Sequence, residues 1–185
     1  MCGEITLVIP SSEYASGIMM FRQELIEASQ QDGSDSFAGC GNLRDCLTAE
    51  EWLEMLEKNR KGTNGKVPSD TYLALHMPDK TIVGIIDLRH HINHPVLSVW
   101  GGHMGYSVRP SERGKGYASQ ILKLNLQNCR KRNMDKVLIT CSRTNIASEK
   151  TILANGGVFE KEIFACGEYI KRYWISLNTI NGVSV

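Results

Sequence analysis

The stretch that most constrains this chain is residues 97–120, where a strand, a basic glycine-containing loop and a helix follow one another. Apolar residues recur up to Val108, and the run Arg-Pro-Ser-Glu at 109–112 then interrupts the strand pattern. The loop reads Arg-Gly-Lys-Gly at 113–116, and a helical pattern begins at Tyr117. This order places a basic turn at a helix N-terminus, which indicates a site for a phosphate-bearing ligand.

The loop has the chemistry that such a ligand needs. The first N–H groups of a helix have no partner within the helix, and the helix dipole adds partial positive charge there. Gly114 and Gly116 lack the β-carbons that would hold a diphosphate away from the backbone, and Arg113 and Lys115 add charge. A dinucleotide-binding fold would have a third glycine where Ser119 stands, and no Gly-Lys-Ser/Thr follows as a nucleotide P-loop requires.

The remaining patterns predict one α/β domain spanning residues 1–185, which is long enough to bury its own core. Residues 31–47 are rich in Gly, Ser and Asp and are predicted to form a loop, and Thr48 opens the next helix with a capping box to Glu51. Residues 178–185 are expected to be frayed. Besides the strand that runs from about Leu97 to Val108, strands are predicted over 4–9, 70–77, 81–89, 136–141, 158–166 and 168–177, and helices over 12–30, 48–61, 117–132 and 145–155.

The loop also carries a more specific spacing. It reads Arg-x-x-Gly-x-Ala at 113–118, after a strand that ends Gly-Tyr-x-Val at 105–108. This spacing resembles the acetyl-CoA signature of the GCN5-related N-acetyltransferases, the GNAT superfamily, and the run over 101–118 is similar to one branch of predicted bacterial acetyltransferases. The resemblance continues to about Trp174. It implies an α/β (α+β) fold with a central mixed, mostly antiparallel, twisted sheet of about seven strands, about four flanking helices and a splayed strand pair.

The resemblance also implies where the acetyl-CoA cosubstrate lies. The splay should separate the strands at 104–108 and 137–141, and the pantetheine arm should fill the gap. Backbone groups of Tyr106 and Val108 are expected to meet the arm, and the loop and the start of the helix are expected to hold the pyrophosphate. The cofactor-binding residues are therefore predicted to be Tyr106, Val108, Arg113, Gly114, Lys115, Gly116, Tyr117, Ala118 and Asn145.

A second family pattern, Asn-x-x-Ala-x-x-x-Tyr-x-x-x-Gly, is only partly matched downstream. Asn145 and Gly156 match it, but Ile152 stands where the tyrosine would protonate the leaving thiolate. Asn145 is expected either to bond the arm or to act only as a helix N-cap. Another group or water must then supply the proton, and Tyr169 or Tyr173 of the last predicted strand could replace the missing tyrosine.

A general base for the amine should have a pKa near the working pH, which favours histidine. His103 lies among glycines on the predicted cofactor strand, where water and substrate are expected to reach it. The alternative is a strand histidine bonded to a neighbour. His90, His91 and His94 lack a cysteine or acidic partner at ligand spacing, so no metal site is predicted.

The composition limits the partners. A formal net charge of +1 argues against a nucleic-acid-binding protein, and no apolar run approaches the length of a membrane span. The N-terminus lacks the basic and apolar regions of a signal peptide, so a cytoplasmic location is expected. The protein is expected to be a monomer or a homodimer.

Two functional interpretations follow. The first is an N-acetyltransferase that moves acetyl from acetyl-CoA to a primary amine of a small molecule or peptide by direct attack. The alternative is a non-catalytic acyl-CoA-binding sensor or partner-binding module, which the isoleucine at 152 favours.

Overall fold

The computed structural model describes residues 3–33, 37–63 and 65–177, and its strands form two sheets. The expected total of seven strands is confirmed, as are the four longer helices. The strands are β1 (Ile5–Val8), β2 (Ser69–His76), β3 (Ile82–Arg89), β4 (Tyr106–Val108), β5 (Lys136–Ser142), β6 (Val158–Ala165) and β7 (Glu168–Ser176); the helices are α1 (Ala15–Asp32), α2 (Ala49–Lys61), α3 (Tyr117–Lys131) and α4 (Ile146–Ala154). The expected fraying of residues 178–185 lies outside the described residues.

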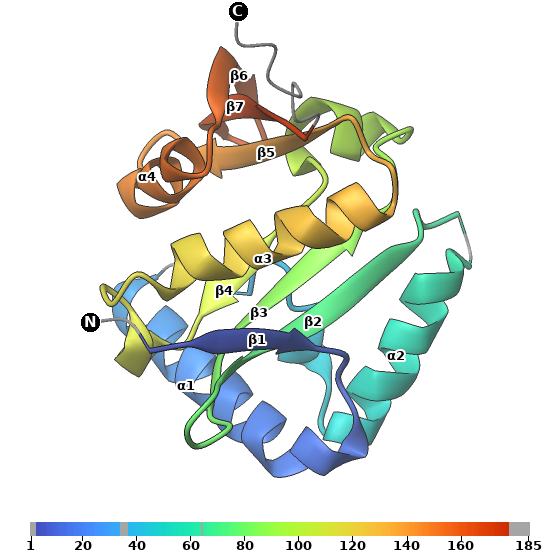
Figure 1. Ribbon diagram of the computed structural model, residues 1–185, viewed down its shortest axis with the longest axis vertical. Helices are drawn as coiled ribbons and strands as arrows, with labels where there is room; N and C mark the ends of the chain where they lie inside the picture. The colour runs from blue at the N-terminus through green and yellow to red at the C-terminus, as the bar shows by residue number, and fades with distance from the viewer. Residues whose placement is uncertain (1–2, 34–36, 64, 178–185) are drawn as a thin grey trace, which may run out of the picture.

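The large sheet has the order β1-β2-β3-β4 and the small sheet the order β5-β7-β6, each with antiparallel neighbours (Figure 1). Strand pairing does not continue from β4 to β5, so the expected central sheet is divided at this point. The gap between β4 and β5 is the predicted splay between the cofactor strand and the strand after the crossover helix.

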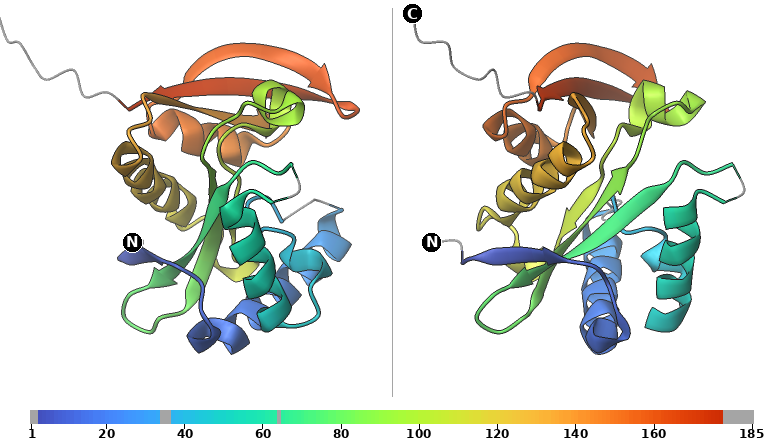
Figure 2. Two further views of the ribbon diagram at one scale, coloured as in Figure 1. Left: turned by 90° about the vertical axis from the view of Figure 1, so that its right-hand side faces the viewer. Right: turned by 45° about the vertical axis from the view of Figure 1, so that its right-hand side comes forward.

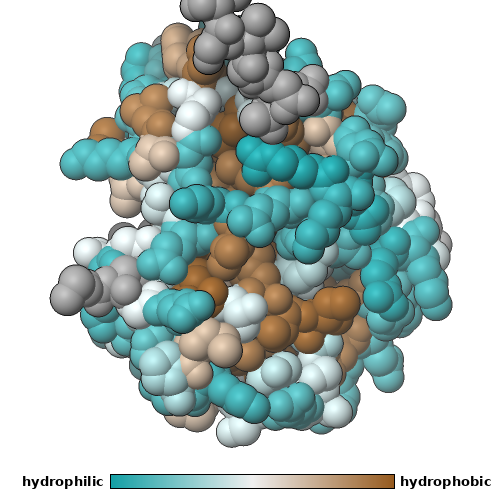
Figure 3. Space-filling view, in the orientation of Figure 1, coloured by the Kyte–Doolittle hydropathy of each residue, from teal (hydrophilic) through white to brown (hydrophobic). Residues whose placement is uncertain are grey.

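Two hydrophobic clusters hold the helices on the sheets. On one face of the large sheet, α1, α2 and the 37–46 segment bury Phe21, Leu43 and Trp52 against Leu73 and Ile85. On the other face, α3 packs against both sheets, as Figures 1 and 2 show. Hydrophilic residues cover the outer side of α3, with apolar residues above and below it (Figure 3). The position of α3 therefore fixes the two sheets relative to each other.

Residues 37–46, the described part of the segment between α1 and α2, are packed into the core, although their composition predicts a surface loop. Cys40 is fully buried and its carbonyl oxygen accepts a hydrogen bond of 2.8 Å from the Trp52 indole. A β-carbon at Gly39, which has a φ of +74°, would lie 2.0 Å from the Gly105 carbonyl oxygen. The described part of the segment is thus packed directly against the residues that precede β4. The expected capping box of α2, between Thr48 and Glu51, is present.

The prediction of a strand beginning near Leu97 is wrong. Residues Leu97–Gly101 form a π-helical turn, and β4 begins only at Tyr106. Arg172 of β7 donates hydrogen bonds to the carbonyl oxygens of Ser98 and Val99, so a side chain satisfies groups that a strand ladder would otherwise pair. No helix in the described ranges is long and apolar enough to cross a membrane.

Candidate active site

The loop from β4 to α3 presents open backbone at the surface. Gly116 is the N-cap of α3, with a φ of 89°, and provides no side-chain cap for the first helical N–H groups. A β-carbon at Gly114 would meet no atom within 4 Å. Arg113 and Lys115 are exposed, and Lys115 pairs with Glu112 at 2.9 Å. Arg113 Nε donates a hydrogen bond of 3.4 Å to the Val108 carbonyl oxygen, so it stays beside the end of β4. This geometry supports the predicted phosphate site, because uncapped N–H groups and two exposed cations lie together at the surface.

A cavity of about 840 Å³ lies beside this loop. Gly114, Lys115 and Tyr117 form its wall on the α3 side, and His76 and Asp79 from the β2–β3 turn line it opposite. His76 Nδ1 lies 3.0 Å from Asp79, and backbone and side-chain hydrogen bonds from Thr81 and His76 lower the pKa of Asp79 to about 2. The loop therefore borders both the end of β4 and this cavity.

The outer edge of β4 supports the predicted contacts of Tyr106 and Val108. In an antiparallel pair, successive residues direct their N–H and C=O groups alternately toward and away from the partner strand. Gly105 C=O accepts from Asp87, and Arg109 N–H donates to Val83, so the odd-numbered residues face β3. The backbone groups of Tyr106 and Val108 consequently face the gap toward β5.

His103 closes one end of this gap. Its backbone N–H donates to the Leu138 carbonyl oxygen at 2.8 Å, and the Leu138 N–H donates to His103 Nδ1 at 2.9 Å. A β-carbon at Gly102 would lie 2.7 Å from the same carbonyl, which shows how closely the two segments approach. These two hydrogen bonds, called here the His103–Leu138 clasp, join β5 to the residues preceding β4.

The prediction that water and substrate reach His103 is therefore wrong. The residue is 6% exposed, and burial lowers its pKa from 6.5 to about 4. A neutral imidazole has one acceptor nitrogen, and the N–H of Leu138 occupies it, so Nε2 carries the proton and has no lone pair for a substrate. The hydrogen bond to a neighbouring segment, given as the alternative from the sequence, is observed, although His103 precedes β4 and does not lie in a strand.

The N-terminus of α4 borders the gap from the side of the small sheet. Asn145 is exposed and its side-chain oxygen accepts a hydrogen bond of 3.0 Å from the Ser148 N–H, so it is a helix N-cap. Its amide group remains at the surface, where contact with the arm is still a prediction. Ile152 is fully buried in the core, and a β-carbon at Gly157 would lie 2.4 Å from its side chain.

A polar cluster lies beneath α4, beside the gap. Tyr106 Oη lies 2.9 Å from Ser148 Oγ, which connects β4 to α4. Tyr173 of β7 donates a hydrogen bond of 2.5 Å to Glu149, and Lys171 contacts the same carboxylate at 2.8 Å. Burial, followed by this hydrogen bond, raises the pKa of Tyr173, and the Lys171 hydrogen bond lowers that of Glu149. Tyr173 and Tyr106 thus contact adjacent residues of α4, Glu149 and Ser148, and the hydroxyl proton of Tyr173 is directed to the Glu149 carboxylate.

Tyr169 lies apart from this cluster. The residue is 48% exposed, and its ring stacks under the Arg143 guanidinium at 4.3 Å and contacts Phe164 edge-on near the β6–β7 turn. The structure does not bring it together with His103 or the phosphate loop.

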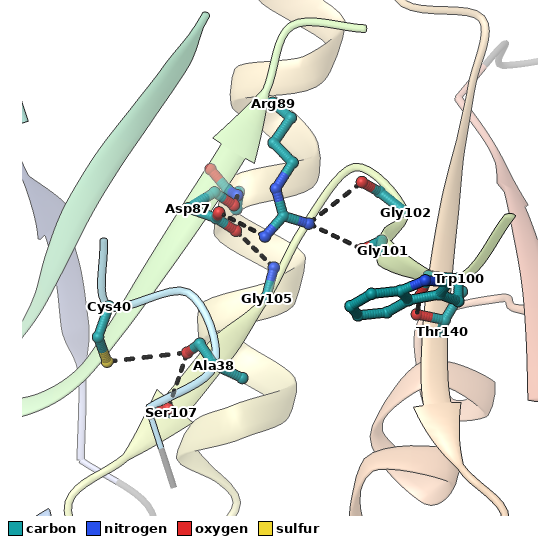
Figure 4. Close-up of polar contacts among 11 residues, drawn as sticks. Ala38, Cys40, Asp87, Arg89, Trp100, Gly101, Gly102, Gly105, Ser107 and Thr140 are labelled. Carbon is teal, nitrogen blue, oxygen red and sulfur yellow. Dashed lines mark hydrogen bonds and ion pairs between the residues drawn. The ribbon is translucent and has the colours of Figure 1, made fainter. Parts of the chain in front are cut away.

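A second polar cluster, not foreseen from the sequence, lies on the α1–α2 side of the gap (Figure 4). Asp87 is buried, accepts a hydrogen bond of 2.5 Å from the Gly105 N–H and pairs with Arg89 at 2.9 Å. Arg89 also donates to the carbonyl oxygens of Gly101 and Gly102. Burial raises the pKa of Asp87 and the Arg89 charge opposes that shift. Side chains of β3 therefore fix the glycine-rich residues that lead into β4.

Figure 4 shows the Trp100 indole extending from the side of β5 into the gap, below Gly101. The Trp100 carbonyl oxygen accepts a hydrogen bond of 2.5 Å from Thr140 of β5.

One signal for the Asp87–Arg89 pair is visible in the sequence, because both residues interrupt an otherwise apolar strand. Among the residues that the structure describes, no group of three His, Cys, Asp or Glu is arranged to hold a metal ion.

Comparisons with known proteins bear on the family and the fold of this chain. A family model described as an acetyltransferase (GNAT) domain matches residues 25–158. Mycobacterium smegmatis RimJ in complex with CoA-disulfide has a TM-score of 0.67 at 14% identity, over 94% of this chain and 82% of that chain. RimL, a ribosomal alpha-N-protein acetyltransferase in complex with coenzyme A, has a TM-score of 0.64 at 16% identity, over 93% of each chain.

A chimera of the spermidine N-acetyltransferase SpeG from Vibrio cholerae and hSSAT has a TM-score of 0.61 at 18% identity, over 95% of this chain and 96% of that chain. At such low identities, the structural similarity shows a shared fold and nothing more. A search among curated proteins gives no match.

Proposed function

The chain belongs to the GNAT acetyltransferase family, and we propose that it moves the acetyl group of acetyl-CoA to a primary amine by direct attack. The observation that carries this proposal is the continuity between an open strand edge and an uncapped helix. Within the described residues, the outer backbone edge of β4 has no strand paired to it, and it leads directly into the loop at the N-terminus of α3, from which Arg113 donates a hydrogen bond of 3.4 Å to the Val108 carbonyl oxygen. A ligand with a diphosphate at one end and an amide-containing arm fits both features.

The residues that would hold acetyl-CoA divide into two groups. Arg113, Lys115 and the backbone from Gly114 to Ala118, including Tyr117 at the start of α3, would bind the diphosphate through charge and helix N–H groups. Tyr106 and Val108 would pair with the arm through their backbone, with Asn145 at the other wall of the gap. The bound molecule supplies a thioester, whose carbonyl carbon is the electrophile.

Direct transfer needs proximity and removal of a proton from the amine. The gap holds the thioester in one place, and backbone N–H groups of β4 would stabilise the oxygen that becomes negative. His103 cannot take the proton while its Nδ1 accepts from Leu138. The amine would therefore reach the site already neutral, after losing its proton to solvent.

The acceptor class follows from what the similar proteins share. RimL is named for an alpha-amino group of a protein and SpeG for spermidine, and both acceptors are amines of very different size. We accordingly propose that the acceptor is the amine of a small molecule or a peptide. The protein itself is proposed to act in the cytoplasm as a monomer or homodimer, with no nucleic-acid or membrane partner. The alternative, an acyl-CoA-binding sensor or partner-binding module, is favoured by Ile152.

Thiol release from acetyl-CoA tests the proposal. The protein would be incubated with pooled polyamines, peptides and aminoglycosides, with mass spectrometry of each pool for a product heavier by one acetyl group. The Gly116→Glu variant is the matched control, because it places a carboxylate against the diphosphate. Amine-dependent thiol release by the wild type alone supports the proposal. Binding of acetyl-CoA without release on any pool supports the alternative.

A further inference from the structure

Breaking a thioester with an amine leaves a thiolate, and a positioned acid that gives it a proton lowers the barrier. Ile152 has no proton to give. A positioned acid would therefore have to be another side chain that borders the gap between β4 and β5, and water is the alternative proton source.

The two ends of the gap limit where the sulfur can lie. The phosphate loop at 113–116 marks one end, and the His103–Leu138 clasp closes the other. The thioester is at the end of the arm remote from the diphosphate, so it lies toward the clasp. Tyr106 is the residue of β4 nearest to the clasp, and its backbone faces the gap.

The side chain of Tyr106 crosses the gap on the α4 side. Its backbone belongs to β4, whereas its hydroxyl lies 2.9 Å from Ser148 Oγ and 3.5 Å from the Ser148 carbonyl oxygen. An arm that fills the gap between β4 and β5 would therefore run beside this phenol. Burial raises the pKa of Tyr106 to about 12, with Cys141 of β5 adding to the rise, so the phenol stays protonated at neutral pH.

The two other tyrosines near the last strand are less suited to this role. Tyr173 is 2% exposed and its proton is directed to the Glu149 carboxylate. Tyr169 lies near the β6–β7 turn under Arg143. Of these three tyrosines, Tyr106 alone combines a backbone on the gap with a hydroxyl that lies beside the Ser148 hydroxyl, a neutral group that can itself donate.

Resting on the proposed function, we propose that Tyr106 is the catalytic acid and that Ser148 holds its phenol in place. The amine nitrogen forms the new bond to the acetyl carbon, the carbon–sulfur bond breaks, and its electron pair goes to sulfur. The Tyr106 hydroxyl proton moves to that sulfur. Water then reprotonates the phenolate, and the nitrogen releases its extra proton to solvent.

The test compares Tyr106→Phe with the matched control Tyr173→Phe, which also removes one buried phenolic oxygen. We expect Tyr106→Phe to lower kcat by about 100-fold or more with little change in the KM for acetyl-CoA, and Tyr173→Phe to retain most of kcat. Ser148→Ala should give a smaller loss, because the acid is kept but less well oriented. Melting curves of each variant separate these effects from loss of folding.

Binding provides a readout that does not depend on turnover. If the phenol donates to sulfur, Tyr106→Phe should weaken binding of CoA in proportion to its thiolate fraction, so the loss should grow as pH rises from about 7 to about 9. Cys141, the titratable group beside the phenol, has a pKa raised to about 11 by burial and stays a thiol in this range. Desulfo-CoA, which lacks the thiol, should bind both proteins equally.

Wild-type kcat in Tyr106→Phe, or equal losses for CoA and desulfo-CoA, would overturn the assignment of Tyr106. Failure of the proposed function looks different: the wild type itself would release no thiol with any amine. The comparison of CoA with desulfo-CoA remains decisive in that case.

Discussion

The clasp between His103 and Leu138 should make the stability of the fold depend on pH. Burial lowers the pKa of His103 from 6.5 to about 4. Between these values the unfolded chain binds a proton that the folded chain excludes, so stability is fully present above about pH 6.5 and is lost as the pH falls toward about 4. A pKa difference of about 2.5 corresponds to about 3 kcal/mol at the acid limit and to about 2.5 kcal/mol at pH about 4.5.

Urea unfolding at pH values from about 7 to about 4.5 measures this dependence. The matched variant is His103→Asn, whose side-chain oxygen can accept from the Leu138 N–H but does not titrate in this range. Carboxylates titrate in both proteins, so the difference between their unfolding free energies isolates His103. That difference should change by about 2.5 kcal/mol over the range, to the disadvantage of the wild type at low pH. A difference that stays constant would refute the buried, neutral histidine and the clasp built on it.

Three further changes test other parts of the structure. Gly39→Ala should destabilise by at least about 2 kcal/mol in urea unfolding, because its β-carbon would lie 2.0 Å from the Gly105 carbonyl oxygen at a positive φ; wild-type stability would contradict this packing. Thr48→Ala should cost about 1 kcal/mol by removing the capping box of α2, and no shift in the urea midpoint would count against it. Tyr169→Phe should keep turnover and binding, since its ring is half exposed near a turn; a large loss of kcat would restore its predicted role as acid.

Local patterns were sufficient for most of the fold. The hairpin of β2 and β3 was predicted within one or two residues, because two apolar runs flank a Pro-Asp-Lys turn. The helix after the phosphate loop was predicted from its apolar stripe, and it begins at Tyr117 as expected. The splayed pair was an implication of the family resemblance, and β4 and β5 do lie in separate sheets.

The segment at 97–101 shows where local patterns stop being sufficient. Its alternating apolar residues favour a strand, but a π-helical turn forms because Arg172, far along the chain, binds its carbonyl oxygens. The prediction that water and substrate reach His103 is wrong for a related reason. Its neighbours in sequence are small and suggest access, whereas its partner Leu138 comes from a strand beyond α3. Contacts between residues so far apart in the sequence produce no periodic pattern from which they could be predicted.

For the same reason, the sequence predicts some parts of the candidate site and misses others. The phosphate loop is one continuous stretch, so its composition and spacing were enough. Asp87 and Arg89 bind glycines more than ten residues away, and the hydroxyl of Tyr106 meets Ser148 on another element. The sequence indicated Tyr106 through its backbone and gave no sign of its side-chain role.

The central claim is that the loop before α3 binds the diphosphate of acetyl-CoA, and calorimetric titration tests it most directly. Wild type should bind acetyl-CoA, with NAD and ATP much weaker at equal concentration. Arg113→Ala should lose about 1–3 kcal/mol of binding free energy, and Gly116→Glu should show no measurable binding while keeping the wild-type circular dichroism spectrum. Wild-type affinity in a folded Gly116→Glu variant, or tighter binding of NAD than of acetyl-CoA, would contradict the account.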